Sequence, residues 1–371
     1  MMRRFVSYLH RLQHLRLVQL VIIAILPLLY LLLHSASSGI GYCRGLNFTR
    51  STQATSCSLE VDLKDTGRLR NRMPCSEADI VKNAEFLSKS STTCPSEPWY
   101  WEWQSKLLAS PAATYIEVGC NKASDAVLNL RAFTGNTGVD IDEWQQATKL
   151  GGHACAFDRE RWNSVVKNPS GTLYTHFCIE AAAENAKPVQ EAARQLGYDK
   201  LGLRVYHNAV SSSTTPSTIR FPVIPPGAES VGIDTDHSQY AEFYEVNVTT
   251  VDTFVEANDV KSLDVLKIDT EGNDPLVIIG ATNTLMRLKP SYLQFENHGI
   301  GRWKTWHLKD VIDLLDNLSY ECFWATNSGK LIRLSMCYSS EYDKMKTWSN
   351  VACYNRGKTA IRSIMEGYVW S

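Results

Sequence analysis

The stretch 263–281, LDVLKIDTEGNDPLVIIGA, constrains the fold more than any other part of the sequence. Its apolar run at 265–268 is typical of a buried strand and ends abruptly at 269–272, after which a helical pattern begins. Glycine permits the sharp turn between the two. Ligands bind at the carboxyl ends of strands in open α/β sheets, so Asp269 and Glu271 are predicted to lie at a ligand site. The alternative is that Asp269 only caps the helix and Glu271 is solvated.

The first 33 residues predict a basic tail followed by a membrane segment. Residues 1–16 carry four arginines, and residues 17–33 form an uncharged apolar run. About 17–20 apolar residues are enough to span the hydrocarbon core of a bilayer. Because the basic residues precede the run, the positive-inside tendency predicts a cytosolic tail, an uncleaved signal-anchor and a lumenal remainder. A cleaved signal peptide is the alternative, since small residues at 35–37 would suit cleavage.

The cysteines and glycosylation triplets agree with a lumenal location. All ten cysteines follow the apolar run, and an oxidising lumen permits disulfides. Asn-x-Ser/Thr triplets begin at Asn47, Asn247 and Asn317. We therefore expect a single-pass type II membrane protein with its catalytic domain in the lumen of the Golgi or ER. Residues 34–98 are rich in Ser, Thr and Cys, with weak helical periodicity only near 77–87, and predict a stem.

From residue 99 strand and helix patterns alternate, which is typical of a mostly parallel sheet. The strand pattern at 114–119 carries Glu117 and runs through Gly119 into a helical pattern. Gly119 lets the backbone approach a ligand, and the start of the helix offers free N–H groups. About 20 residues later, 138–142 predicts a second strand ending in Asp140, whose carboxylate can accept both ribose hydroxyls of a nucleoside.

Later strand patterns also end in polar residues. Residues 291–296 predict a strand with Glu296 and His298 at its end, and 225–239 predicts a polar lid over a site. His298 can take a proton from a hydroxyl nucleophile, the alternative being a surface or core histidine. If the strands are parallel neighbours, one edge of the sheet gathers Glu117, Asp140, Asp269, Glu271, Glu296 and His298. Asp269 and Glu271 can position a substrate, bind a divalent cation or act as a base, and these options stay open.

A hairpin closes the sheet pattern. Residues 320–326 and 330–334 are strand-like and flank Asn327-Ser328-Gly329, a sequence that favours a tight turn. The sheet is therefore predicted to end in an antiparallel pair.

The motifs of this chain resemble those of the FkbM-type methyltransferases, within the class I S-adenosylmethionine-dependent superfamily. The resemblance covers residues 99–356, and its most specific part is KIDTEG at 267–272. Its other motifs are YIEVGCNKA at 115–123, HNAVS at 207–211, VDTF at 251–254, FENH at 295–298, the 320–334 hairpin and NVACYNR at 350–356. It implies an α/β, Rossmann-like, mostly parallel seven-stranded sheet with a C-terminal antiparallel hairpin, preceded here by the predicted transmembrane helix. Residues 357–371 would be a C-terminal tail.

The resemblance also implies the roles of individual residues. S-adenosyl-L-methionine would be held by Glu117, Gly119, Asn121, Asp140 and Asn208. The methyl acceptor, a hydroxyl group on a glycan or small molecule, would face Asp269, Glu271, Glu296 and His298. A divalent metal is compatible with this chemistry but is not required, and no metal ligand is assigned. The chain departs from the family pattern, which usually has Asp, Ala and Gly, at Glu117, Cys120 and Ala123, and 149–203 is longer than expected.

Two other functions fit parts of the sequence. A type II Golgi glycosyltransferase would use Asp140-x-Asp142, or Asp234-x-Asp236, to hold a metal and a nucleotide sugar. A non-catalytic anchored protein with a decayed pocket is the other possibility. The net charge of −1, without a Lys/Arg-rich run in the globular part, gives no support to nucleic-acid binding. The expected partners are the membrane and the glycan or small-molecule acceptor.

Overall fold

The computed structural model describes residues 46–47, 60–61, 74–107, 110–151, 173–345 and 347–370. The chain divides into two compact units, Met1–Asp65 and Thr66–Ser371. In the first unit, β1 (Leu46–Asn47) pairs antiparallel with β2 (Glu60–Val61). No helix in the described part of the chain is long and apolar enough to cross a membrane. The predicted basic tail at 1–16 and the predicted anchor at 17–33 lie outside the described residues.

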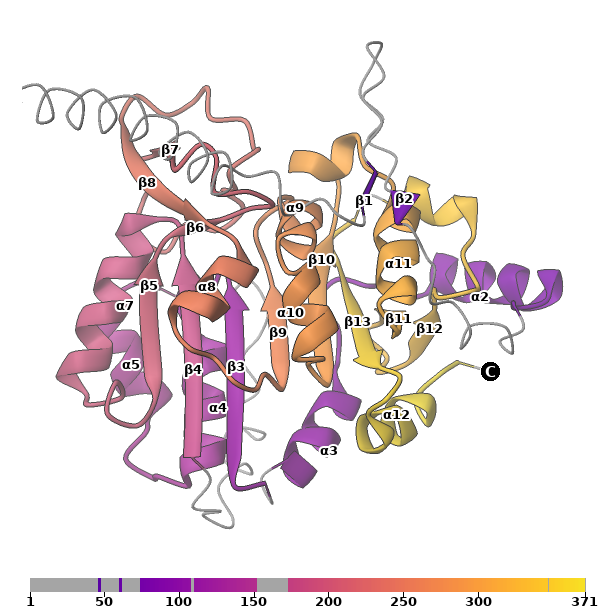
Figure 1. Ribbon diagram of the computed structural model, residues 1–371, viewed down its shortest axis with the longest axis horizontal. Helices are drawn as coiled ribbons and strands as arrows, with labels where there is room; N and C mark the ends of the chain where they lie inside the picture. Colours follow the sequence, from indigo (N-terminus) through magenta and orange to yellow (C-terminus); the bar gives the residue numbers. More distant parts are fainter. Residues whose placement is uncertain are drawn as a thin grey trace, which may run out of the picture. The chain divides into compact units, whose positions relative to one another are not determined.

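The second unit is built on an eight-stranded sheet (Figure 1). Its strands, in spatial order, are β12 (Leu331–Arg333), β11 (Tyr320–Ala325), β13 (Ser349–Asn355), β10 (Tyr292–Asn297), β9 (Val265–Ile268), β3 (Ala112–Val118), β4 (Leu173–Glu180) and β5 (Leu203–His207). The five strands from β10 to β5 are parallel, whereas β13 runs antiparallel to both of its neighbours. The prediction of a mostly parallel sheet is confirmed.

The prediction of seven strands is wrong, because the sheet has eight. The predicted hairpin is present as β11 and β12, which pair antiparallel around a turn whose Gly329 has φ +73°. β13 inserts between this hairpin and the parallel strands, and the antiparallel pair of β11 and β12 forms this edge of the sheet, as predicted. The edge strand β12 is short, which limits the unpaired backbone that it exposes.

Helices cover both faces of the parallel strands. In the view of Figure 1, α8 (Val251–Ala257) and α10 (Thr282–Arg287) lie in front of the strands, and α4 (Ser124–Thr134) and α5 (Ile141–Thr148) lie behind them. α7 (Ala183–Gln195) packs on β5 and contacts α5, and α9 (Asp274–Ile279) contacts β10. The parallel strands are consequently rich in buried apolar side chains, as expected for a sheet covered on both sides.

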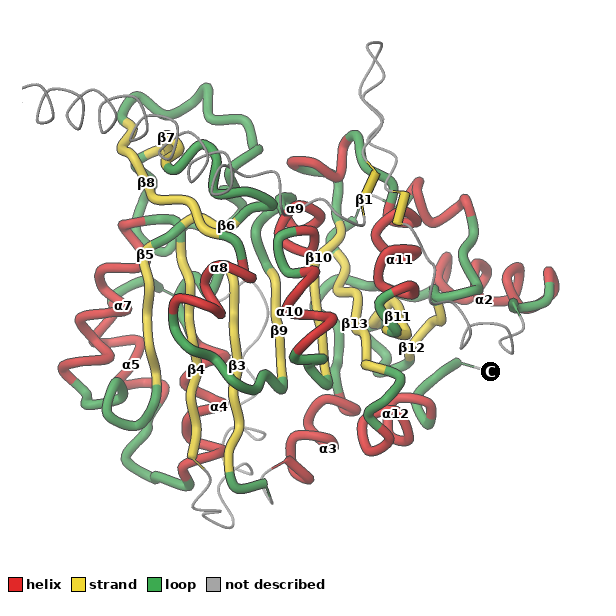
Figure 2. Tube along the Cα trace, viewed as in Figure 1, coloured by secondary structure: helices red, strands yellow, loops and turns green. Residues whose placement is uncertain are grey.

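The remaining elements surround the antiparallel strands and the carboxyl ends of the parallel ones. α11 (Leu308–Asn317) packs on β11, and α12 (Thr359–Glu366) packs on β13 and on α3 (Pro98–Leu107). Two short 3₁₀ helices are η1 (Gly301–Lys304) and η2 (Ser340–Lys344). A three-stranded sheet, drawn at the upper left of Figure 2, comprises β6 (Ala209–Val210), β8 (Phe243–Thr249) and β7 (Thr218–Pro222).

Part of the segment expected to be a stem belongs to the second compact unit, which begins at Thr66. Residues 74–98 include α2 (Glu77–Lys89), which confirms the helix predicted near 77–87. A disulfide joins Cys75 to Cys337, and the Thr92 hydroxyl bonds to the Ser349 hydroxyl at 2.6 Å. These contacts fix the segment to the antiparallel half of the sheet.

The predicted strand at 138–142 does not form. Asp140 instead precedes α5 as its N-cap, and its carboxylate accepts hydrogen bonds from the backbone N–H groups of Asp142 and Glu143. An aspartate in this position satisfies N–H groups that the helix leaves unpaired, and this local gain replaces strand pairing. On the side of β3 away from β9, the neighbouring parallel strand is β4, at 173–180, within a region that the sequence interpretation described as longer than expected.

Candidate functional site

The carboxyl ends of four parallel strands, β3, β4, β9 and β10, open into one cavity of about 1120 Å³. It is lined by eight of the nine predicted site residues: Glu117, Gly119, Asn121, Asn208, Asp269, Glu271, Glu296 and His298. The convergence arises because parallel strands place their carboxyl ends on the same edge of a sheet. Of the polar residues expected to meet at one edge, the cavity gathers Glu117, Asp269, Glu271, Glu296 and His298 but not Asp140.

Asp140 is not among the residues that line the cavity. Its carboxylate is occupied by the first turn of α5, and its own N–H donates to the Tyr198 hydroxyl at 2.8 Å. The expectation that Asp140 accepts the ribose of a nucleoside rested on a strand that is absent from this part of the structure.

Glu180 takes the position that the sequence interpretation gave to Asp140. It is the last residue of β4, next to β3, and it lines the cavity. Its Oε2 accepts from the N–H of Asn121 and its Oε1 from the N–H of Ala182, both at 2.8 Å. Burial raises the pKa of Glu180 to about 7, because an ionised carboxylate is poorly solvated there. The sequence feature that could have pointed to Glu180 is its place as an acid at the end of 173–180, LYTHFCIE, a stretch with several strand-favouring residues.

The loop after β3 approaches the neighbouring strand very closely. Gly119 has φ +81°, and a Cβ at this position would lie 1.7 Å from the carbonyl oxygen of Asp269. Only glycine fits such an approach in this backbone conformation. The loop continues into α4, whose N-cap Ala123 is left-handed with φ 53° and makes no side-chain cap. The N-terminus of α4 faces this loop, and helix N-termini favour anionic groups of a ligand.

Glu117 is already engaged by basic side chains. It is 3% exposed, and its two oxygens lie 3.0 Å from Nε2 of His176 and 3.0 Å from Nζ of Lys267. Lys267 also pairs with Asp125 at 2.5 Å, at the start of α4. A disulfide between Cys120 and Cys178 joins the loop to β4. These contacts suit a role in holding the loop, because the Glu117 carboxylate has little capacity left for a ligand.

Asp274 organises the other side of the cavity. It is fully buried, and its Oδ2 accepts from the Thr270 hydroxyl and the Gly272 N–H, both at 3.2 Å. Its Oδ1 accepts from the Glu296 N–H at 3.2 Å. Burial, then the negative charge of Asp269, raises the pKa of Asp274 to about 7. This carboxylate ties the turn after β9 to β10, and the sequence interpretation did not single it out.

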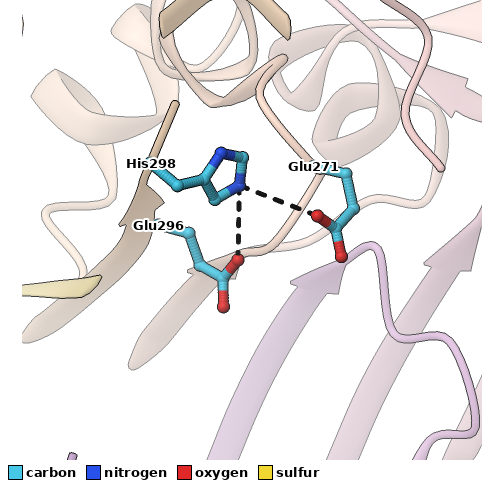
Figure 3. A group of neighbouring side chains, drawn as sticks. All are labelled: Glu271, Glu296 and His298. Carbon is cyan, nitrogen blue, oxygen red and sulfur yellow. Dashed lines mark ion pairs between the residues drawn. The ribbon is translucent and has the colours of Figure 1, made fainter. Parts of the chain in front are cut away.

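Glu271, Glu296 and His298 point toward one another at the edge of β9 and β10 (Figure 3). Nε2 of His298 lies 3.7 Å from Oε2 of Glu271 and 3.7 Å from Oε2 of Glu296. Burial lowers the pKa of His298 to about 4, so the ring is neutral near pH 7. Burial and the charge of Asp269 raise the pKa of Glu271 to about 8. Asp269 also lines this side, and burial raises its pKa to about 6.

The predicted lid, 225–239, supplies part of the cavity lining. The Ser230 N–H donates to Oε1 of Glu271 at 2.9 Å, and Glu229 pairs with Lys122 at 2.7 Å. Asp234 pairs with Arg302 at 2.7 Å. The loop therefore contacts both the turn after β3 and the turn after β9.

The described lining of the cavity is strongly acidic. It holds three lysines against nine carboxylates, which are Glu97, Glu117, Asp125, Glu180, Glu229, Asp236, Asp269, Glu271 and Glu296. Two of the lysines, Lys122 and Lys267, pair with carboxylates of this same set. A lining with more carboxylates than basic side chains favours cationic ligands and opposes anionic ones.

Comparison with known families gives an independent assignment. Residues 99–322, more than half of the chain, match the family described as the methyltransferase FkbM domain. The chain belongs to the FkbM methyltransferase family. A search of curated proteins finds no match.

Similar solved structures include three methyltransferases. Methyltransferase FkbM from Methylobacillus flagellatus KT is 12% identical over 66% of this chain and 44% of that chain, with a TM-score of 0.35. The SAM-dependent methyltransferase from Agrobacterium tumefaciens is 9% identical over 69% and 61%, with a TM-score of 0.29. The human methyltransferase 10 domain containing protein is 10% identical over 76% and 97%, with a TM-score of 0.29. This chain thus spans less than half of the length of the first of these structures.

The FkbM match contains every predicted site residue and also Glu180, but it ends before β13. Trp348, just before β13, lines the cavity, and its indole N–H donates to Oε1 of Glu296. The part of this FkbM-family chain beyond the match therefore contributes a side chain that touches the acidic cluster.

Proposed function

We propose that this chain is an S-adenosylmethionine-dependent methyltransferase that methylates a hydroxyl oxygen of a glycan or small molecule. The observation that carries the proposal is the cavity itself, where a close glycine turn and the acids at four strand ends meet. Family membership supports methyl transfer in general. The acidic lining supports a cationic ligand, and the methyl donor has a sulfonium group.

The residues on the β3 and β4 side fit the donor. Glu180 offers a carboxylate to ribose hydroxyls, as acids at this edge do in nucleoside sites. Gly119 permits close backbone approach, and the uncapped start of α4 suits the carboxylate end of the donor. Asn121 and Asn208 line the same side with amide groups. When bound, S-adenosylmethionine supplies a methyl group on sulfonium sulfur, whose bond to carbon breaks with the electron pair left on sulfur.

The residues on the β9 and β10 side would receive the acceptor. Asp269 follows β9 directly and lines the cavity. Its carbonyl oxygen adjoins Gly119, and its carboxylate lies close enough to Glu271 and Glu296 that, in addition to burial, its charge raises their pKa values. We assign Asp269 as the group that takes the proton of the acceptor hydroxyl. Positioning of reacting groups supplies much of the rate enhancement in such transfers. The lid contributes by excluding water from the site.

The aromatic lining supports a sugar as acceptor. Trp101, near the start of the sequence match, and Trp348, beyond its end, both line the cavity. Flat indole faces suit the apolar faces of sugar rings, whereas their N–H groups bind polar partners. A glycan would also offer several hydroxyl groups to the carboxylates.

We also propose a lumenal location, as a type II protein anchored by residues 17–33. Its support is the uncharged apolar run and the disulfides Cys75–Cys337, Cys120–Cys178 and Cys322–Cys353, since disulfides persist in oxidising compartments. Asn247 is exposed on β8, where a glycan could be attached, whereas Asn317 is the last residue of α11.

No observation favours the glycosyltransferase alternative. Asp140 and Asp142 belong to the start of α5 and do not line the cavity. In the second acid pair, Asp234 is paired with Arg302. The acidic cavity would also repel the diphosphate of a nucleotide sugar.

The proposal is tested by calorimetry on the full-length protein with S-adenosylhomocysteine. We expect one molecule to bind per chain and nucleotide sugars not to compete. Transfer of a labelled methyl group from S-adenosylmethionine to a panel of oligosaccharides then identifies the acceptor. If S-adenosylhomocysteine does not bind, or if a nucleotide sugar displaces it, the proposal is wrong.

A further inference from the structure

The imidazole of His298 is buried in an unusual environment. The residue is 6% exposed, and neither ring nitrogen has a hydrogen-bond partner among the described residues. Buried polar atoms are nearly always bonded, so an unsatisfied imidazole inside a cavity calls for a ligand. A hydrogen bond to either neighbouring glutamate is ruled out by the 3.7 Å separations.

The geometry of the three side chains fits a shared cation. Glu271, Glu296 and His298 each offer one ligand atom, and these atoms lie within 4.8 Å of one another. Two atoms bound to one cation at about 2.1–2.4 Å, with an angle of about 90–110° between the bonds, lie roughly 3.0–3.9 Å apart. The 3.7 Å distances from the histidine nitrogen to each glutamate fall in this range.

The outer oxygen of each glutamate is held by a neighbouring donor. Oε1 of Glu271 accepts from the Ser230 N–H at 2.9 Å, and Oε1 of Glu296 accepts from the Trp348 indole N–H. These donors leave the two Oε2 atoms facing His298 (Figure 3). Bonds of this kind to the outer atom of a ligand orient it and tune a metal site.

The charges around the cluster point the same way. Asp269 lines the same cavity, and Asp274 accepts the Glu296 N–H at 3.2 Å, so further carboxylates surround the two glutamates. Of the lysines that line the cavity, Lys122 and Lys267 are paired with carboxylates outside the cluster, and Lys304 is exposed. A divalent cation would neutralise the like charges that Glu271 and Glu296 bring together.

We propose that Glu271, Glu296 and His298 bind a divalent first-row transition cation, of which Mn²⁺ is the representative. One imidazole with two carboxylates suits such a cation better than Mg²⁺ or Ca²⁺, which prefer oxygen ligands alone. The site rests on the geometry of this chain. Its catalytic role rests on the proposed function: the cation would bind the acceptor hydroxyl and lower its pKa, and Asp269 would take the released proton.

The test is Mn²⁺ binding to the full-length protein after chelator treatment, followed by electron paramagnetic resonance and calorimetry. We expect one Mn²⁺ per chain, with Mg²⁺ and Ca²⁺ binding at least tenfold more weakly. Glu296→Gln and His298→Ala should each weaken Mn²⁺ binding at least tenfold. Glu180→Gln removes a carboxylate from the same cavity outside the cluster, and it should change Mn²⁺ binding less than threefold.

Binding of S-adenosylhomocysteine by Glu296→Gln and His298→Ala reports whether these variants are folded and separates the two proposals. Circular dichroism reports the folding of Glu180→Gln, whose nucleoside binding is itself expected to weaken. If the nucleoside binds to the wild type and Mn²⁺ does not, the metal site is refuted and the proposed function stands. If Mn²⁺ binds and the nucleoside does not, the proposed function fails and the metal site stands. Mn²⁺ binding that survives both cluster substitutions in folded protein would place the cation elsewhere and overturn the inference.

Discussion

The two sides of the cavity satisfy their carboxylates in different ways. On the β3 and β4 side, Glu117 is paired with His176 and Lys267, and Glu180 accepts two backbone N–H groups. On the β9 and β10 side, Glu271 and Glu296 face each other across a neutral histidine without a bonded nitrogen in the described structure. The carboxylates of both sides have partners within the chain, but the histidine of the second side has no hydrogen-bond partner among the described residues.

This difference suggests how the two ligands are handled. The β3 and β4 side, whose carboxylates are already held in place, can bind the methyl donor with little reorganisation, which favours affinity. On the β9 and β10 side, the carboxylates of Glu271 and Glu296 repel each other, and a cation, a proton or an acceptor group can relieve this repulsion. Groups with strongly shifted pKa values gather at sites of chemistry for this reason. Four measurements test this contrast between the two sides of the cavity.

The largest effect is expected from Asp269→Asn. The substitution keeps the size of the side chain but removes its ability to take a proton, and loss of a general base typically costs about 10²–10⁴-fold in rate. We expect kcat, measured with an acceptor found in the oligosaccharide screen, to fall by about 10³-fold, while S-adenosylhomocysteine affinity changes less than threefold. An equal loss of nucleoside affinity would show that Asp269 belongs to the donor side.

Removal of the disulfide on the donor side should mainly cost stability. Replacing Cys120 and Cys178 by alanine together should lower the free energy of unfolding by about 2–4 kcal/mol, because the crosslink no longer restricts the unfolded chain. Urea denaturation measures this change. The matched control replaces Cys322 and Cys353, which join β11 to β13 far from the donor loop. Only the replacement of Cys120 and Cys178 should also weaken nucleoside binding. If both double variants bind S-adenosylhomocysteine equally well, the loop after β3 does not position the donor.

Glu180→Gln should weaken S-adenosylhomocysteine about 10–100-fold, because a hydrogen bond to a charged group is worth about 1.5–3 kcal/mol. Asp140→Ala is the matched control, and calorimetry compares the two. Loss of this N-cap should cost about 1 kcal/mol of stability and leave nucleoside affinity within threefold. The reverse ranking of the two affinities would restore Asp140 as the ribose acceptor.

The smallest effect concerns pH. The folded-state pKa of Glu180 is raised to about 7, so its ionised form dominates above pH 7 and is lost as the pH falls. If the ionised carboxylate accepts the ribose hydroxyls, Kd for S-adenosylhomocysteine should rise by up to tenfold per pH unit below about 7 and be flat above it. Calorimetry between pH 5.5 and 8.5 checks the profile. Glu180→Gln should remove this slope, and an unchanged slope would assign it to another group.

Local patterns in the sequence were sufficient for much of this fold. The apolar run at 265–268 and the acids after it correctly predicted β9 and its loop, and the turn at 327–329 predicted the β11–β12 hairpin. Buried strands and tight turns leave such signals because burial and backbone geometry act over a few residues. Strand number depends on distant pairing, so the insertion of β13 was not visible locally.

The choice between Asp140 and Glu180 shows the limit of spacing arguments. Both end short segments that contain apolar residues, and Asp140 lies at the more familiar distance from Gly119. The chain instead forms α5 at that point and reaches the neighbouring parallel strand only at Leu173. An acid before a helix serves equally well as an N-cap, so local chemistry does not distinguish a cap from a ligand. The lack of hydrogen-bond partners for the His298 ring nitrogens among the described residues could not be predicted from the sequence either, because it depends on three-dimensional packing.

A crystal structure of the protein with S-adenosylhomocysteine would show whether a methyl-donor nucleoside lies where the ends of β3, β4 and β9 meet. We expect ribose hydroxyls within hydrogen-bond distance of Glu180 and the amino-acid end of the ligand at the start of α4. A nucleoside bound at Asp140, or anywhere outside this cavity, would contradict this expectation.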